Sequence, residues 1–182
     1  NTRGLPGMLT PTYHEFARLP NDGNRYEIIA GDLYVTPSPT LTHQKTIMNL
    51  SYVLEGFIRA HGLGQLYLGP VDVLFAEGDY LTPDLAFIRA DHVGILQERG
   101  IEGAPDLVIE VVSPSTAGRD RTLKRERYAA YGVAEYWVVD ANTRRVEIYR
   151  GFEAAEIATE AFTWRPVEGG PELRVQVVDL LR

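Results

Sequence analysis

The stretch APDLVIEVVSPSTAGRDRTLKRERYAAY, Ala104–Tyr131, joins an apolar run to a highly charged one. Its first part, 106–112, predicts a β-strand with apolar residues on both faces, which are Leu107, Ile109 and Val111 on one face and Val108 and Val112 on the other. Such a strand is typical of the centre of an α/β sheet that is covered on both sides. Glu110 interrupts the pattern, and an unpaired charge buried there would cost several kcal/mol. Glu110 therefore needs a cation, a proton or a metal ion as its partner.

The composition is that of an ordinary globular protein. The 182 residues are 45% hydrophobic and 24% charged, which is enough for one compact domain with its own core. The lack of cysteine excludes disulfides and thiolate zinc sites. No apolar run approaches the roughly 20 residues of a membrane span and no signal peptide is evident, so we expect a cytoplasmic protein with no membrane partner. With a net charge of −7, a nucleic-acid partner would have to be held by local basic patches or by metal ions.

We expect a single domain over residues 8–182. The sequence NTRGLPG before Met8 does not resemble a natural start, whereas Met8 and the LTPTYHEF that follows it do. Residues 1–7 are therefore interpreted as a remnant of expression cloning. No repeat, low-complexity tract or linker divides the remainder.

Hydrophobic periodicity and turn residues predict alternating helices and strands. A hairpin is expected around Gly31, which supplies a positive φ, and a long helix is expected from Thr42 until Gly62 stops it. A second helix, 119–131, places Lys124, Tyr128 and Tyr131 on one face. The other predicted helices are 12–19 and 91–99, and the other predicted strands are 25–29, 33–36, 66–69, 71–76, 85–89, 135–139 and 145–149, with weaker signals at 162–164 and 173–177.

Three charged residues fall at positions where they can converge. Asp84 follows Pro83 immediately before one apolar strand, Glu110 lies within the next, and Lys124 lies in the helix after that. Carboxylates from neighbouring strands can bind a hard divalent cation, and Mg²⁺ needs only one or two of them. A nearby ammonium group can orient the attacking water and stabilise developing phosphate charge.

The order of these residues resembles that of the PD-(D/E)xK nuclease superfamily, and the chain is most similar to its Uma-type family of restriction endonucleases. The resemblance extends from about residue 12 to residue 150. The blocks that carry it are RYEIIAGDL (25–33), PSPTLTHQ (37–44), TPDLAFI (82–88), APDLVIEVVSPST (104–116) and DRTLKRERYAAYGVAEYWVVD (120–140).

The resemblance implies roles for particular residues. Asp84 and Glu110 would be the metal-binding carboxylates, Lys124 the catalytic lysine and Glu27 an accessory acid near the metal. The backbone carbonyl of Val111 would be a further metal ligand, and the cofactor would be Mg²⁺, with Mn²⁺ as an alternative.

The sequence departs from the superfamily at one position. The usual lysine stands two residues after the glutamate, where this chain has Val112. The Uma-type pattern resembles other branches of the superfamily in which the catalytic lysine has moved to the following helix. Lys124 would take the place of that lysine in this chain.

The resemblance also implies the fold and the partners. We expect an α/β, restriction-endonuclease-like domain with a mixed sheet of four or five strands flanked by helices and with an N-terminal hairpin. The implied reaction is hydrolysis of phosphodiester bonds in nucleic acid, with DNA as the expected substrate. A homodimer is expected by analogy, because cutting both strands of a duplex normally takes two active sites.

Each residue also has a purely structural interpretation. Glu110 can be half of a buried ion pair with Lys124 or an arginine. Asp84 can cap the turn after Pro83, Lys124 can be a solvated helix lysine, and Glu27 can face solvent. His43, in the first turn of the long helix, is interpreted as a partly buried structural histidine.

Two other functional classes remain open. A nuclease fold that has lost catalysis and only binds nucleic acid or another partner is favoured by the acidic charge and by Val112. A metal-binding structural protein is the other. The chain contains no dinucleotide fingerprint, phosphate-binding P-loop, nucleophile elbow or paired-histidine zinc motif.

Overall fold

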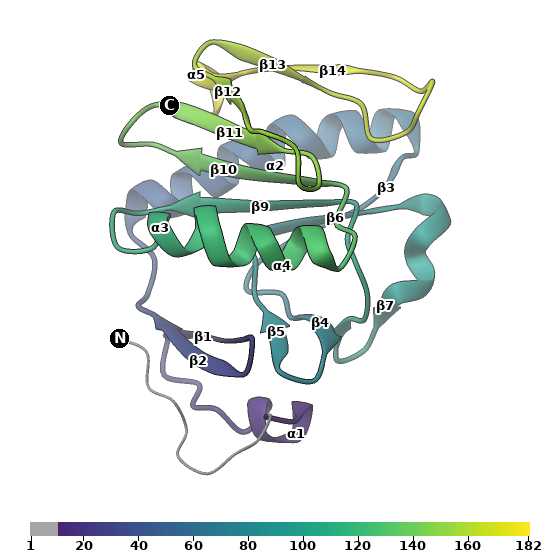
Figure 1. Cartoon of the computed structure of the whole chain (residues 1–182). Helices are drawn as coiled ribbons and strands as arrows, with labels where there is room; N and C mark the ends of the chain where they lie inside the picture. The colour runs from purple at the N-terminus through teal and green to yellow at the C-terminus, as the bar shows by residue number, and fades with distance from the viewer. Residues whose placement is uncertain (1–10) are drawn as a thin grey trace.

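The computed structural model describes residues 11–182, and the expectations for residues 1–7 and Met8 lie outside this range. The described chain forms a mixed α/β fold with two six-stranded sheets and a two-stranded one (Figure 1). The expected α/β architecture, with a mixed sheet flanked by helices and a hairpin near the N-terminus, is confirmed.

The central sheet is built around the strand that the sequence marks as its centre. Its strand order is β12-β11-β10-β9-β6-β3, with β9 and β10 parallel and the other neighbours antiparallel. The resemblance implied four or five strands, but the structure has six. The additional strand is the short and largely exposed β12, which pairs with the edge of β11. The strands are β3 (Gly64–Leu68), β6 (Leu85–Arg89), β9 (Leu107–Val112), β10 (Glu135–Asp140), β11 (Arg145–Tyr149) and β12 (Glu156–Ala158).

The two faces of the central sheet pack against different partners. One face of β9, with Ile109 and Val111, contacts the long helix α2 (Leu41–His61), whose buried stripe includes Leu50, Leu54 and Ile58. The other face packs against the helical segment that follows β9 (Figure 1). Both faces of β9 are buried, as predicted, so Glu110 lies inside the protein.

Helix α2 follows the expected pattern closely. The hydroxyl of Thr40 accepts a hydrogen bond from the N–H of His43 and so caps the first turn. The helix ends before Gly62, whose φ of 59° places it in the left-handed region that glycine tolerates.

The helical segment after β9 is less regular than expected. The single helix predicted over 119–131 consists of α3 (Ala117–Arg119), a π-helical turn η2 (Asp120–Lys124) and α4 (Arg125–Ala130). The surface helix predicted over 91–99 is instead a shorter 3₁₀ segment, η1 (Ala90–Ile95).

The C-terminal part, whose role the sequence leaves open, closes the core. Strands β13 (Ala161–Trp164) and β14 (Leu173–Gln176) form a hairpin followed by the short helix α5 (Val177–Leu180). Trp164 packs edge-to-face against Trp137 and Phe87. The weak strand signals in this region were therefore correct, and the hairpin covers the same face of the sheet as α2.

The second sheet includes the N-terminal hairpin, which is formed by its strands β1 and β2. Its order is β2-β1-β5-β4-β8-β7, and α1 (Tyr13–Phe16) packs against it, shorter than the predicted 12–19. Three of its strands were not predicted, since they are two or three residues long and form by pairing with neighbours. The strands are β1 (Arg25–Ile29), β2 (Asp32–Thr36), β4 (Val73–Ala76), β5 (Asp79–Leu81), β7 (Leu96–Gln97) and β8 (Gly100–Ile101).

Among residues 11–182, none of the helices has the length and apolar character needed to cross a bilayer.

Candidate active site

The sheet register brings Asp84 to Glu110. Strands β6 and β9 are antiparallel with Leu85 opposite Ile109, so the residue before β6 lies beside the next residues of β9. The Asp84 Oδ2 atom accepts a hydrogen bond of 2.7 Å from the N–H of Val111. The alternative interpretation of Asp84, as a cap of the turn after Pro83, does not account for this hydrogen bond, because the Asp84 carboxylate accepts it from the neighbouring strand β9.

A glycine holds the backbone of Asp84 close to the end of β3. The N–H of Gly69 donates to the carbonyl oxygen of Asp84 at 2.6 Å. A Cβ at position 69 would lie 2.5 Å from the carbonyl oxygen of Pro83, which is closer than a side chain can approach. Gly69 is therefore required for the position of Asp84 as well as for the local packing.

Arg25 lies between the two carboxylates. Its Nη1 atom is 2.9 Å from Asp84 Oδ1 and 3.7 Å from Glu110 Oε2. The same guanidinium approaches Glu27, with Nε 3.8 Å from Oε1. Two acidic side chains that are far apart in the sequence thus face one common cation.

Lys124 points into the protein and contacts two carboxylates. Its Nζ atom is 2.7 Å from Glu27 Oε2 and in close contact with Glu110 Oε1, and the side chain is fully buried. The hydroxyl of Tyr128, one turn later, donates to the same Glu110 oxygen at 3.0 Å. The alternative in which Lys124 is a solvated helix lysine is wrong.

Glu27 is also part of this buried cluster. It is fully buried, and its Oε2 atom accepts a hydrogen bond of 2.9 Å from the N–H of Thr82. The solvent-facing alternative for Glu27 is therefore wrong, because β5 and the helix that carries Lys124 cover its strand.

The structure adds three charged residues that the sequence reasoning missed, which are Asp120, Arg119 and the Arg25 described above. Asp120 is 1% exposed, and its Oδ1 atom lies 3.9 Å from Lys124 Nζ. Arg119 approaches Glu27 at 4.0 Å and donates a hydrogen bond to the hydroxyl of Thr36. The signal for Asp120 was its position four residues before Lys124 on the same helical face. Arg25 carried a similar signal, since it alternates with Glu27 along one strand.

His43 forms part of the wall of the site. Its Nε2 atom is 3.2 Å from Asp84 Oδ2, and 18% of the side chain is exposed. The interpretation of His43 as partly buried was correct, but its neighbour is a site carboxylate and not an apolar core.

The pKa values of the cluster are shifted by burial and by neighbouring charges. Burial raises the pKa of Glu110 to about 8, against the opposing effect of Lys124. Burial also raises the pKa of Glu27 and Asp84, but neighbouring cations and hydrogen bonds outweigh it, and both pKa values fall below their usual range. Burial lowers the pKa of Lys124, yet Glu110 and Glu27 together hold it above its usual value. Lys124 is therefore a cation at neutral pH.

A pocket of about 500 Å³ leads to this cluster. It is lined by Arg25, His43, Asp84 and Val111 together with the loops 36–40, 68–70 and 113–116. Glu110 and Lys124 do not line it, because they lie behind Arg25 and are fully buried. A substrate in this active-site pocket would therefore meet Arg25, His43 and Asp84 first.

The donor atoms fit a hard divalent cation. Within residues 11–182, no three His, Asp or Glu side chains already surround a common point, and Arg25 contacts both Asp84 and Glu110. Glu110 Oε2 and Glu27 Oε1 are buried without a hydrogen-bond donor from the described chain. Buried carboxylate oxygens of this kind are the ligands that Mg²⁺ prefers, so the cluster can accept the ion if Arg25 moves aside.

The sheet, its flanking helices and the hairpin define a restriction-endonuclease-like α/β fold. A crystal structure described as that of a putative nuclease belonging to DUF820, from Anabaena variabilis, has this fold, with a TM-score of 0.79 and 21% sequence identity over 93% of this chain and 97% of that one. Residues 13–178 match the family Uma2, described as "Putative restriction endonuclease", and the chain belongs to this family. No curated protein matches the chain.

Proposed function

We propose that this protein is a nuclease that hydrolyses phosphodiester bonds in DNA with Mg²⁺ as its cofactor. The observation that carries the proposal is the meeting of Asp84, Glu110 and Glu27 with a buried Lys124 at the end of a pocket. Membership of a family described as restriction endonucleases supports the same reaction class.

The metal ion would be held by the carboxylates of Asp84 and Glu110 and by the backbone carbonyl of Val111. When bound, it would supply Lewis-acid polarisation of the phosphate and would activate a water molecule. Mn²⁺ would satisfy the same oxygen ligands.

The side chains of the chain itself would bind and orient the phosphate. Arg25 and His43, at the wall of the pocket, are placed to contact its non-bridging oxygens. Lys124 is protonated at neutral pH because its pKa is raised, so it would stabilise developing negative charge and would not act as a base. Glu27 and Tyr128 would be positioning residues. Glu27 would hold the Lys124 amine in place, and Tyr128 would hold the Glu110 carboxylate.

Two observations favour a second function, a nuclease fold that binds nucleic acid without cutting it. Arg25 already neutralises Asp84 and Glu110 at the place where the ion would bind. Val112, where the superfamily has its lysine, is buried in the apolar cluster with Tyr128 and Val138. A protein of this kind would bind DNA with or without Mg²⁺ and would leave it intact.

Cleavage of supercoiled plasmid with Mg²⁺ distinguishes the two functions. The proposal predicts cleavage that EDTA abolishes and that Asp84→Asn and Lys124→Met each reduce by at least about 100-fold, as expected for loss of a metal ligand or of a charge-stabilising group. Glu98→Gln, at an exposed residue outside the site, is the matched control and should cleave normally.

Two results would overturn the proposal. The first is binding of DNA without cleavage at any Mg²⁺ or Mn²⁺ concentration, which would support the non-catalytic function. The second is equal cleavage by Asp84→Asn and the unmodified protein when both have the same thermal midpoint, which would place the activity elsewhere.

A further inference from the structure

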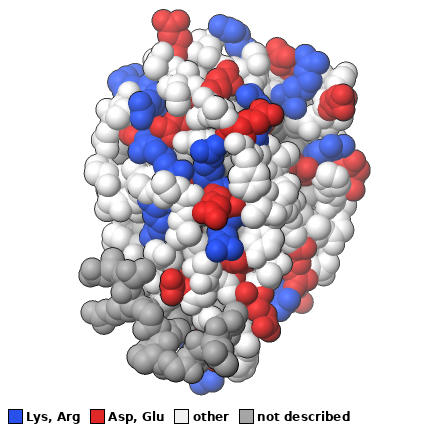
Figure 2. All heavy atoms as spheres, viewed as in Figure 1, with Lys and Arg blue, Asp and Glu red and all other residues white. Residues whose placement is uncertain are grey.

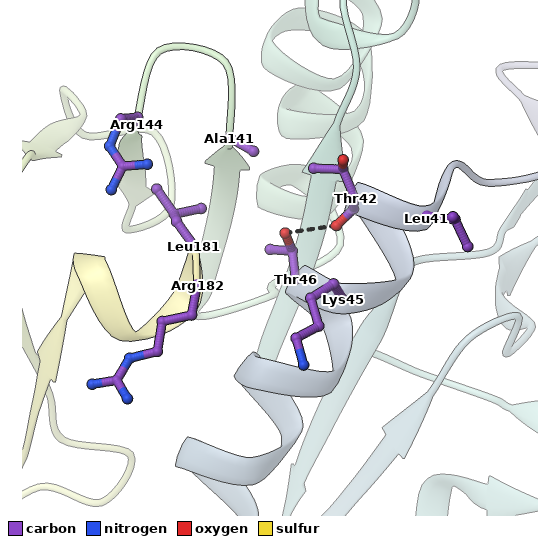
Figure 3. Close-up of a pocket in the computed structure, with 8 residues that line it drawn as sticks. All are labelled: Leu41, Thr42, Lys45, Thr46, Ala141, Arg144, Leu181 and Arg182. Carbon is purple, nitrogen blue, oxygen red and sulfur yellow. Dashed lines mark hydrogen bonds between the residues drawn. The ribbon is translucent and has the colours of Figure 1, made fainter.

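A second pocket, separate from the candidate active site, has three basic side chains and no acidic one among its lining residues. It has a volume of about 450 Å³ and lies where three segments meet, the first turns of α2, the turn between β10 and β11, and the end of the chain after α5 (Figure 3). Its lining residues are Leu41, Thr42, Lys45, Thr46, Ala141, Arg144, Leu181 and Arg182. Three of these are basic and none is acidic, in a chain with a net charge of −7.

Two of the basic side chains are available to a ligand. Lys45 and Arg144 are exposed, and neither forms an ion pair with any residue in the range 11–182. Arg182 is held by Asp179 and contributes its charge at the edge of the pocket. Arg144 sits at a φ of 52°, and the turn that carries it is anchored by Asp140, whose Oδ1 accepts from the N–H groups of Asn142 and Thr143.

The pocket is rigidly attached to the rest of the fold. The hydroxyl of Thr46 donates to the carbonyl of Thr42 at 2.9 Å on its helical wall (Figure 3). The side-chain amide of Asn49 donates to the carbonyl of Leu180 at 3.1 Å, which fixes the end of α5 against α2. The cationic groups are therefore presented from a fixed scaffold, which reduces the entropy lost on binding.

Helix α2 connects this basic pocket with the active-site pocket. Thr40, His43, Gln44 and Ile47 line the active-site pocket, whereas residues 41, 42, 45 and 46 line the basic one, so the two pockets lie on opposite sides of the same helical turns. A helix with its side chains is about 10–12 Å across. A strand that occupied both pockets would therefore have to span the width of this helix.

We propose that the basic pocket binds the phosphate backbone of the nucleic-acid substrate, on the opposite side of helix α2 from the bond in the active-site pocket. The proposal rests on the proposed function. Phosphate contacts by lysine and arginine fix the register of a strand without reading its sequence. On the face drawn in Figure 2, basic and acidic side chains are interspersed, whereas the charged residues that line this pocket are all basic, which favours an anionic partner.

The first test measures binding of a fluorescent 30-base-pair duplex by anisotropy in EDTA, where no cleavage occurs, over a series of salt concentrations. The double variant Lys45→Ala/Arg144→Ala should weaken binding at least about tenfold and lower the slope of log K against log salt by about two, one for each lost phosphate contact. The matched control is Arg18→Ala/Arg174→Ala, which removes two exposed arginines that line neither pocket and form no ion pair within residues 11–182. The control should lose neither affinity nor slope.

The second test uses the lysine content of the chain and needs no variant. The sequence has two lysines, and Lys124 is fully buried, so Lys45 is the lysine that reagents can reach. The duplex should slow acetylation of Lys45 at least about fivefold. The extent of acetylation is measured by mass spectrometry of peptides after the labelled protein is digested.

The outcomes separate this proposal from the proposed function. If the unmodified protein binds and cleaves DNA, but the double variant binds equally well and Lys45 is not protected, the basic pocket is not a backbone site and only this proposal fails. If the unmodified protein neither binds nor cleaves DNA, both proposals fail. Weaker binding by the double variant with normal cleavage at saturating DNA is the result expected if both are right.

Discussion

At the scale of single residues, the structure accounts for how Glu110 can lie in the core. The sequence leaves three partners open, and the structure supplies two cations, Lys124 and Arg25, with a hydroxyl from Tyr128. The cluster has more buried carboxylates than basic side chains, which leaves an excess of negative charge near Glu110. The four carboxylates are those of Glu27, Asp84, Glu110 and Asp120, and the three basic side chains are those of Arg25, Arg119 and Lys124. A proton can balance this excess, and the raised pKa of Glu110 is consistent with one.

The first prediction concerns the pH dependence of stability. The pKa of Glu110 is raised from its ordinary 4.5 to about 8 in the folded protein, so between these values the folded state holds a proton that the unfolded chain has released. Stability should therefore decline as the pH rises from 5.5 to 8.5. Glu27 and Asp84 have lowered pKa values and act in the opposite direction only at more acidic pH.

The variant Glu110→Gln should reduce this decline, since its amide does not titrate. The measurement is the thermal midpoint across that pH range for both proteins. An unmodified protein whose midpoint rises over the range, or a variant with an unchanged slope, would show that Glu110 is ionised throughout.

The second prediction concerns the buried amine. Lys124→Met removes the cation that contacts Glu27 and Glu110 and leaves both carboxylates without this partner. Loss of one member of a buried ion pair is strongly destabilising. We expect the free energy of unfolding to fall by about 3–5 kcal/mol. Lys45→Met, at the exposed lysine, is the control and should change it by less than about 0.5 kcal/mol. Similar denaturant midpoints for the two variants would contradict the ion-pair network.

Most of the residues that meet in the site could be predicted from the sequence, because strand alternation and the PD-(D/E)xK resemblance both point to them. Asp84, Glu110, Lys124 and Glu27 are brought together as expected, although their roles in catalysis stay predictions. The alternation of Arg25 with Glu27 indicates a shared face of one strand, but the contacts of Arg25 with Asp84 and Glu110 depend on two distant strands and could not be predicted. The spacing of Asp120 from Lys124 likewise indicates a shared helical face, but the burial of Asp120 depends on the π-helical turn.

At the scale of elements, long periodic segments were predictable and short ones were not. Helix α2 and strands β6, β9 and β10 have enough residues to show a pattern, and their observed bounds differ little from those expected. The three-residue strand β5 was not predicted, because its pairing with the neighbouring strands β1 and β4 defines it. Tertiary pairing decides such segments, and a single sequence does not contain it.

The third prediction tests the C-terminal hairpin as part of the core. Trp164 is 1% exposed and packs against Trp137, Phe87 and Phe57. Trp164→Ala should therefore lower the free energy of unfolding by about 3–5 kcal/mol through loss of contacts and formation of a cavity.

The control for the hairpin is Phe152→Ala, which removes a large aromatic side chain that is 70% exposed. It should change the free energy of unfolding by less than about 0.5 kcal/mol. Urea unfolding followed by tryptophan fluorescence or circular dichroism measures both. A Trp164→Ala protein as stable as the control would mean that the hairpin is not part of the folded core.

At the scale of the whole molecule, the expected homodimer remains a prediction. One copy of the chain carries one candidate site, and cutting both strands of a duplex in a single encounter takes two. We expect the mass of two chains in analytical ultracentrifugation. We also expect supercoiled plasmid to become linear without accumulation of nicked circles. A monomer that accumulates nicked circles would contradict the dimer while leaving the active site intact.

The central claim is that Asp84 and Glu110 share one divalent ion beside Lys124, and anomalous diffraction from crystals soaked in Mn²⁺ tests it most directly. We predict an anomalous peak between the two carboxylates, with the Arg25 guanidinium displaced from the position in which it contacts both. Arg25 still bridging Asp84 and Glu110, with no peak between them at a Mn²⁺ concentration that saturates any activity, would contradict the claim.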